Sequence, residues 1–275
     1  MFSRGTGGVL ALSTALASCN AINGAGDLTT NGVGSPTDAS ADTPDSPAGD
    51  AAMKDAAQAG DAGTDAGTDA GTAPPLCNPA DPSLLLCLSF DGNALDGSGH
   101  AFVGNATNLG FAPGRVGQAG VFASTSVIFP FRAVFNVTAI TIEAFVTMTT
   151  EPPPGTRMAI VDSDSRFGLF LMPGGMFLCN STVSNTFLAP RPLAPASMHL
   201  TCAADAATSS SYVNGVLAGS TAATQTLPQN GSGISIGMNA PSGDAHSGTI
   251  DELRIWSRVR TTSEIAAAAR RGESD

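Results

Sequence analysis

Short apolar segments alternate with clusters of Gly, Pro, Asn and Asp along the chain from Leu76 onward. Apolar runs of this length, bounded by turn-forming residues, are typical of β-strands. Many such strands without a helix between them predict an all-β, antiparallel two-sheet sandwich. We expect strands at Leu84–Phe90, Gly120–Ala123, Val127–Phe129, Ala139–Thr149, Met158–Asp162, Phe167–Met172, Met176–Cys179, Met198–Ala203, Ser210–Asn214, Val216–Ser220, Gly233–Gly237 and Thr249–Val259.

Alternation of apolar and polar positions is clearest between residues 140 and 148. One face of this segment is wholly apolar and consists of Ile140, Ile142, Ala144, Val146 and Met148. The opposite face is mixed and consists of Thr141, Glu143, Phe145 and Thr147. Because successive side chains of a strand point to opposite faces of its sheet, we expect the apolar face to lie on the core.

Two local signals add detail to this plan. Asn214 and Gly215 form a two-residue hairpin turn signal between two of the expected strands. At the C-terminus, Thr261 and Glu264 stand at the spacing of a capping box, followed by the helix formers of Ile265–Ala269. The sequence therefore predicts one short C-terminal helix beside the sandwich.

The first nineteen residues have the layout of an exported bacterial lipoprotein. Arg4 precedes a short apolar run, Val9–Ala17, which is too short to span a bilayer as a helix. The segment Leu16–Cys19 resembles a lipobox, in which the Cys thiol is lipidated and the preceding peptide is removed. We expect a lipoprotein signal peptide over residues 1–18 and lipidation of Cys19. The alternative is an ordinary secretory signal in which Cys19 is incidental.

A low-complexity linker is expected over residues 19–75. It is built from Gly, Ala, Asp, Thr, Ser and Pro, has no aromatic residue, and contains three tandem Asp-Ala-Gly-Thr repeats. Residues 20–75 hold nine Asp and one Lys, so their net charge is −8. Such a segment buries too little apolar surface to offset its chain entropy, so we expect it to be disordered. Its expected role is to space a folded domain, residues 76–275, from a lipid anchor.

The composition of the chain argues against several classes of protein function. The net charge of −11 argues against nucleic-acid binding, which needs basic surface. With one Trp, one Tyr and three His, the chain has little material for base-stacking platforms or multi-His metal centres. Asn20, in place of Asp, follows the expected lipidated Cys and favours the outer membrane over retention at the inner one. We expect an envelope protein that faces the periplasm or the cell surface, bound to the membrane by its lipid alone.

Four cysteines remain after Cys19, and an even number in an exported domain indicates two disulfides. Cys77 and Cys87 are close in sequence with a turn between them, and Cys179 and Cys202 lie in two of the expected strands. We expect the local pairing, Cys77 with Cys87 and Cys179 with Cys202. A zinc site is disfavoured, because the spacings lack C-x-x-C and no His stands at finger spacing.

Five segments, in order, resemble the motifs of laminin G-like domains in the concanavalin A-like lectin/glucanase superfamily. They are Leu88–Gly99, Pro113–Ala119, Ile140–Val146, Ser211–Gly215 and Gly248–Arg258. The resemblance covers about residues 84–270 and implies a concanavalin A-like jelly-roll sandwich. It also implies a binding module for a glycan or for an envelope or extracellular protein, and we expect a monomer.

The superfamily also contains glucanases, so a glycoside hydrolase or lyase is an alternative function, and a purely structural envelope lipoprotein is another. Two carboxylates must face the same sugar in such enzymes. Asp251 and Glu252 are adjacent, so a regular strand points them to opposite faces, and Asp162 and Asp164 are spaced correctly but run into a turn. We therefore expect no catalytic residues.

Family members often hold a structural calcium ion, and the resemblance suggests Asp96 and Asp251 as its oxygen ligands. By regular alternation Asp251 shares a face with Leu253 and Ile255. The other face consists of Ile250, Glu252, Arg254 and Trp256. The alternatives for Asp251 are an ion pair with an Arg or hydrogen bonds to a Gly-rich turn. In this arrangement Glu143 and Arg254 form a cross-strand pair.

Overall fold

A computed structural model describes residues 75–164, 166–181, 187–223, 226–229, 231–239 and 243–273. The expected signal peptide, Cys19 and all of the expected linker except Pro75 lie outside these residues. Among the described residues, no helix is long and apolar enough to cross a membrane.

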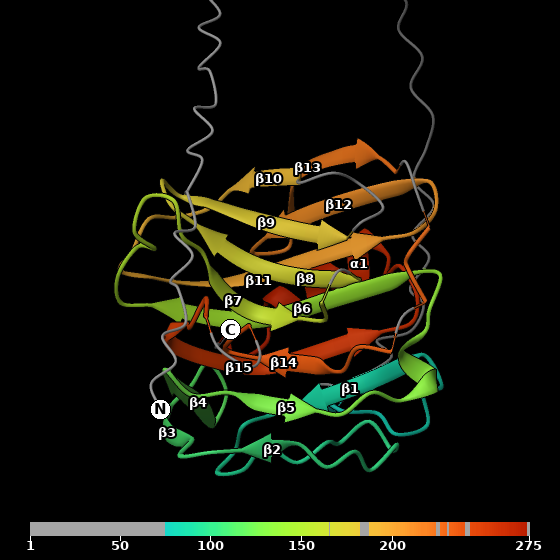
Figure 1. The fold of residues 1–275 in the computed structure, drawn as a ribbon, viewed down its shortest axis with the longest axis horizontal. Helices are drawn as coiled ribbons and strands as arrows, with labels where there is room; N and C mark the ends of the chain where they lie inside the picture. The colour runs from blue at the N-terminus through green and yellow to red at the C-terminus, as the bar shows by residue number, and fades with distance from the viewer. Residues whose placement is uncertain are drawn as a thin grey trace, which may run out of the picture. The chain divides into compact units, whose positions relative to one another are not determined.

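Two antiparallel β-sheets form the fold, as the sequence predicted (Figure 1). The larger, eight-stranded sheet runs in the order β13 (Val216–Ala222), β12 (Thr208–Val213), β11 (Ala196–Ala204), β6 (Ile140–Met148), β15 (Ser247–Trp256), β4 (Gln118–Ala123) and β3 (Gly110–Pro113), and β1 (Leu84–Leu88) pairs with β15. The seven-stranded sheet runs in the order β10 (Phe187–Pro190), β9 (Met176–Ser181), β8 (Phe167–Met172), β7 (Met158–Asp162), β14 (Ile234–Ile236), β5 (Val127–Phe129) and β2 (Asn105–Ala106).

All twelve predicted strands are present, and β5, β7 and β8 have the predicted bounds. The strands β2, β3 and β10 and a 3₁₀ turn, η1 (Ala133–Phe135), were not predicted. These elements have only two to four residues, and neither alternation nor an apolar run bounded by turn residues marks them as strands. Strand β15 ends at Trp256 instead of Val259.

The core lies between the sheets and takes its side chains from the inner faces of both. The five apolar residues that alternate along β6 all belong to it, as the pattern predicted. The opposite face of β6 is also covered, and Thr141 and Glu143 are fully buried there. A second layer therefore lies on the outer side of the larger sheet.

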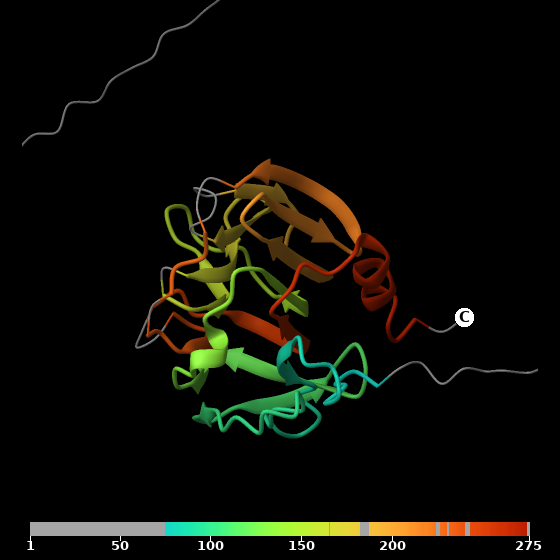
Figure 2. The same ribbon diagram turned by 90° about the vertical axis from the view of Figure 1, so that its right-hand side faces the viewer.

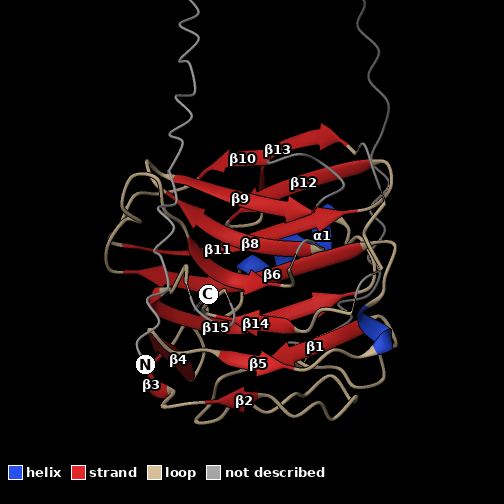
Figure 3. Ribbon diagram, in the orientation of Figure 1, coloured by secondary structure: helices blue, strands red, loops and turns tan. Residues whose placement is uncertain are grey.

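Part of that layer is the helix α1 (Thr262–Ala269), which lies outside the larger sheet (Figure 2). Its N-terminus has the predicted capping box, with Thr261 and Glu264 bonded reciprocally. Ile265 is fully buried against Ala203 and Tyr212 of β11 and β12. The helices α1 and η1 are the only helical elements in the described part of the chain (Figure 3).

The predicted alternation of β15 was wrong after Asp251. The register between β15 and β6 shifts between Asp251 and Arg254, and Glu252 has a φ of 47°. This extra residue is a β-bulge, which reverses the facing of every later side chain. Leu253 therefore joins the core with Ile250, whereas Asp251 and Arg254 lie on the outer face.

The disulfides join Cys77 to Cys87 and Cys179 to Cys202, the same pairing that the sequence predicted. The first ties the segment before β1 to β1, with 5.7 Å between the Cα atoms. The second joins β9 of the smaller sheet to β11 of the larger one, with 5.6 Å between the Cα atoms. Cys179–Cys202 is thus a covalent link across the core between the two sheets.

Removing the cross-sheet disulfide with the double substitution Cys179→Ala and Cys202→Ala should destabilise the domain. The two residues are 23 apart in sequence, and closing a loop of that size contributes about 3 kcal/mol to the free energy of unfolding in the chain-entropy model. Urea denaturation measures this loss. The matched variant Cys77→Ala with Cys87→Ala, whose loop is shorter, should lose less. A smaller loss for the cross-sheet pair than for the matched pair would contradict this prediction.

Candidate functional site

The outer face of the larger sheet carries a groove beside α1. Two adjoining hollows, of about 240 and 280 Å³, share the lining residues Arg115, Phe145 and Ser197. We call their union the outer groove. Three neighbouring strands contribute two outward-facing residues each: Phe145 and Thr147 of β6, Ser197 and His199 of β11, and Thr249 and Asp251 of β15. Their side chains reach this face because they alternate with core residues on three neighbouring strands.

The turn between β3 and β4 forms one wall of the outer groove. Its Arg115 guanidinium lies 5.5 Å from the centre of the Phe145 ring. Arg115 Nε donates to the carbonyl oxygen of Arg271 at 2.8 Å, and its Nη2 lies 3.1 Å from a carboxylate oxygen of Glu273. These contacts join the turn to the segment after α1, so the wall is held from both sides.

Asp251 is held by this same turn. Its Oδ2 accepts hydrogen bonds from the backbone N–H of Arg115 at 2.7 Å and of Val116 at 3.2 Å. A Cβ on Gly114 would lie 2.5 Å from Oδ2, so this close approach requires glycine. Burial raises the pKa of the Asp251 carboxyl to about 6, and the two N–H donors oppose that shift. Of the alternatives for Asp251, the hydrogen bonds to a Gly-rich turn are the ones observed.

The other oxygen of Asp251 makes the groove chemically distinctive. Its Oδ1 is buried and has no hydrogen-bond partner among the described residues. His199 Nε2 is likewise buried and has no hydrogen-bond partner among the described residues. The centre of the His199 ring lies 4.8 Å from the centre of the Phe145 ring. Burial, with Arg254 and Arg260 nearby, lowers the pKa of His199 to about 3, so its ring is neutral. The lining of the groove thus holds unused hydrogen-bonding capacity.

Glu143 forms the predicted cross-strand pair with Arg254, at 2.5 Å between carboxylate and guanidinium. A second guanidinium, from Arg260, lies 2.7 Å from the same carboxylate. Both arginines also lie over the ring of Trp256, at 5.3 and 4.2 Å from its centre. Because Glu143 is fully buried, these charges are shielded from solvent and interact strongly.

The structure places Asp96 and Asp251 in separate hydrogen-bond networks. The oxygens of Asp96 accept from the backbone N–H of Cys87, Ser98 and Phe102 and from the Ser98 hydroxyl, at 2.8 to 3.2 Å. These donors stabilise the carboxylate without a cation. No group of three or more His, Cys, Asp or Glu that would suit a metal occurs within the described ranges. These residues do not make a fitting calcium site, and calcium binding by the chain stays a prediction.

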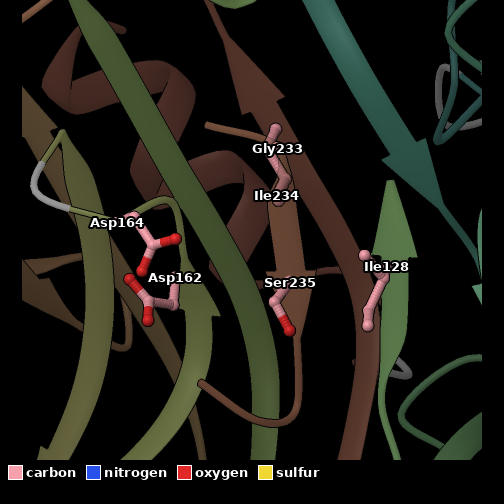
Figure 4. Close-up of a pocket in the computed structure, with 6 residues that line it drawn as sticks. All are labelled: Ile128, Asp162, Asp164, Gly233, Ile234 and Ser235. Atoms are coloured by element: carbon pink, nitrogen blue, oxygen red, sulfur yellow. The ribbon is translucent and has the colours of Figure 1, made fainter. Parts of the chain in front are cut away.

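Asp162 and Asp164, the acid pair at alternate positions, lie together on the smaller sheet. They line a hollow of about 80 Å³ with Ser235 of β14 (Figure 4). Burial, followed by the nearby Asp164 charge, raises the pKa of Asp162 to about 6. The hollow is smaller than ligand pockets of several hundred Å³. We therefore treat this pair as a local feature of the sheet.

The raised pKa of Asp162 predicts a pH-dependent loss of stability. The folded state binds the proton more tightly than the unfolded state does, so stability falls as the pH rises from about 4 through 6. Asp162→Asn should therefore melt higher than the native chain at pH 7.5 and equally at pH 3.5, in thermal melts followed by circular dichroism. Asp164→Asn should give a smaller gain at pH 7.5. A lower melting temperature for Asp162→Asn at pH 7.5 would refute the prediction.

The sequence pattern did not identify Arg115, Ser197 or His199 as groove residues. The signal for Phe145 was present in the alternation of β6, which placed it opposite the core face. For β11 the predicted strand began at Met198, after Ser197, so no alternation included that residue. Arg115 lies in a turn, whose position over the sheet depends on the pairing of β4 with β15.

Two solved structures with a similar fold are described as binding domains. The binding domain of Paraclostridial Mosquitocidal Protein 1 is 15% identical, with a TM-score of 0.58, over 68% of this chain and 52% of its own. The binding domain of botulinum neurotoxin DC in complex with rat synaptotagmin II is 13% identical, with a TM-score of 0.56, over 70% and 52%. The chain thus spans about half the length of these domains. At this identity the likeness concerns the fold.

A third structure is matched over almost all of its length. Domain 4 of AbnA, an extracellular arabinanase from Geobacillus stearothermophilus, in complex with arabinotriose, is 22% identical, with a TM-score of 0.55, over 68% of this chain and 98% of its own. A comparison with curated protein sequences gives no match. The model of a laminin G-like family, described as the concanavalin A-like lectin/glucanases superfamily, matches residues 122–266, just over half of the chain. The chain therefore belongs to the laminin G-like branch of the concanavalin A-like lectin/glucanases superfamily.

Proposed function

We propose that this chain is a non-catalytic binding module that takes a glycan in the outer groove. The observation that carries the proposal is the groove itself, an open hollow on a sheet face whose lining holds unused hydrogen-bonding groups. The arabinanase domain, bound to arabinotriose, has this fold, and a botulinum neurotoxin DC binding domain is described in complex with SialylT. Both likenesses support a carbohydrate ligand.

The chemistry of the lining suits a sugar. Ser197, Thr147 and Thr249 offer hydroxyl groups that both donate and accept hydrogen bonds. The Arg115 side chain is 32% exposed and offers donors at the wall of the groove. Phe145, which is 6% exposed, adds an apolar group to the lining. Such a mixture of hydroxyl, guanidinium and aromatic groups matches the polar rim and apolar ring face of a saccharide.

The non-catalytic part of the proposal rests on how the groove carboxylates are engaged. Asp251 uses one oxygen to hold the β3–β4 turn, and Glu273 pairs with Arg115. A glycosidase needs one carboxylate to protonate the leaving oxygen and another to act as base or nucleophile. Groups that maintain the wall of the groove are poorly placed to serve as that pair.

A bulky residue at Ser197 should block the groove. Ser197 is exposed and lines both hollows, so Ser197→Trp fills the space without disturbing the core. In glycan-array and calorimetric measurements on the full chain, we expect binding to fall at least about tenfold, equivalent to 1.4 kcal/mol. The matched control is Ser220→Trp, on exposed β13 outside the groove. Equal glycan binding by Ser197→Trp and the native chain would exclude this groove as the binding site. Capture of a protein and of no glycan would show that the ligand is a protein.

We further propose that a lipid on Cys19 anchors the module to the outer membrane of a bacterial envelope. The support is the lipobox-like segment after a short apolar run, followed by a long acidic linker. Cys19→Ser should move the protein from the detergent phase to the aqueous phase in phase partitioning. Ser35→Thr, in the linker, is a control that leaves Leu16–Cys19 unchanged. Partition of Cys19→Ser into detergent would disprove the anchor.

A further inference from the structure

A second cavity, of about 500 Å³, lies between β15, α1 and the segment that precedes β1. Five arginines line it: Arg254, Arg258, Arg260, Arg270 and Arg271. The carboxylates of Asp81, Glu264 and Glu273 line it as well. We call it the arginine pocket. Its volume falls in the range of small-molecule sites.

Two arginines of the pocket share one buried carboxylate. Arg254 and Arg260 share the single carboxylate of Glu143, which leaves this buried group with one positive charge in excess. Arg258 and Arg271 pair with Glu264 and Glu252, respectively. A buried excess charge is costly unless an opposite charge approaches it. An anion in the pocket would remove that cost.

Unused donors strengthen the case for an anion. The Nε atoms of Arg254 and Arg260 are buried and lack a hydrogen-bond partner within the described part of the chain. Arg254 is only 5% exposed, yet its side chain lines the pocket. Guanidinium groups present their N–H donors in a planar fork, which matches the two oxygens of a carboxylate. The pocket therefore holds guanidinium groups of the kind that bind a carboxylate-bearing ligand.

The other walls of the arginine pocket are partly apolar. Leu84 and Trp256 belong to a small cluster with Leu76, and the Cys77–Cys87 disulfide closes the segment that carries Leu76 onto β1. Ala267 of α1 also lines the pocket. A ligand that suits these walls combines a charged group with an apolar ring surface, at the size of one or two sugar rings.

We propose that the arginine pocket binds a sugar acid, that is, a uronate unit whose carboxylate faces the guanidinium groups. This site adjoins the outer groove, and binding in it does not require a glycan in that groove. The two cavities lie on either side of the segment after α1, whose Arg270 and Glu273 line both. An acidic glycan and a neutral one are thus recognised by different chemistry on the same face.

The test is calorimetry on the full Cys19→Ser chain with galacturonate, glucuronate and mannuronate, and with galactose as the neutral probe. At least one uronate should bind, and galactose should bind at least about tenfold more weakly, since a charge-assisted contact is worth about 1.4 kcal/mol or more. Ala267→Glu places a negative charge at an exposed helix position of the pocket and should weaken uronate binding at least about tenfold.

Two matched variants distinguish binding in the arginine pocket from a general charge effect and from binding in the outer groove. Thr262→Glu makes the same charge change on an exposed residue of α1 outside the pocket, and Ser197→Trp fills only the outer groove. Both should bind the uronate as the native chain does. The proposal is overturned if no uronate binds at millimolar concentration or galactose binds equally well. It is also overturned if galactose 6-sulfate binds tenfold more tightly than every uronate, or if Thr262→Glu weakens binding as much as Ala267→Glu does.

Discussion

Both faces of the larger sheet depend on one residue of β15 that adopts a left-handed backbone conformation. Without the bulge at Glu252, Asp251 would share a face with Leu253 and Ile255, and a carboxylate would point into the core. Burying it there would cost several kcal/mol or force its protonation. A left-handed residue other than glycine costs about 1–2 kcal/mol. The bulge is thus the arrangement with the lower free-energy cost, and it places Asp251, Arg254 and Trp256 on the outer face.

The side chain of Glu252 also links this bulge to the end of the chain. It accepts from Arg271 Nε at 2.8 Å, and the carbonyl of Arg271 accepts from Arg115. The segment after α1 is therefore bonded to β15 on one side and to the β3–β4 turn on the other. This segment separates the outer groove from the arginine pocket, so the shape of both cavities follows from the same few polar contacts.

The main effect of the buried charges beneath α1 is to fix the position of the helix relative to the sheet. Glu143 with Arg254 and Arg260 carries a desolvation cost that its attractions only partly offset, so the group is weak evidence for stability. Its positional effect is clear, however, because Arg260 immediately precedes the N-cap Thr261 of α1. Loss of Arg260 would leave Glu143 paired with Arg254 alone and would remove the contact that holds the start of the helix. The two disulfides act on other parts, one across the core and one at the wall of the arginine pocket.

From the sequence alone came the sheet class, nearly all strand positions, the inward face of β6, the capping box of α1 and the disulfide pairing, because each is written in local spacing. The Glu143–Arg254 pair also followed from placing the Leu253 face of β15 inward. Only the tertiary structure shows which way the side chains of β15 point after Asp251. The sequence does not reveal the bulge, because both faces of this strand carry apolar residues. The tertiary structure also determines where the two cavities form and which residues line them. Arg115, Ser197 and Asp251 come from segments far apart in the chain, and only strand pairing brings them together.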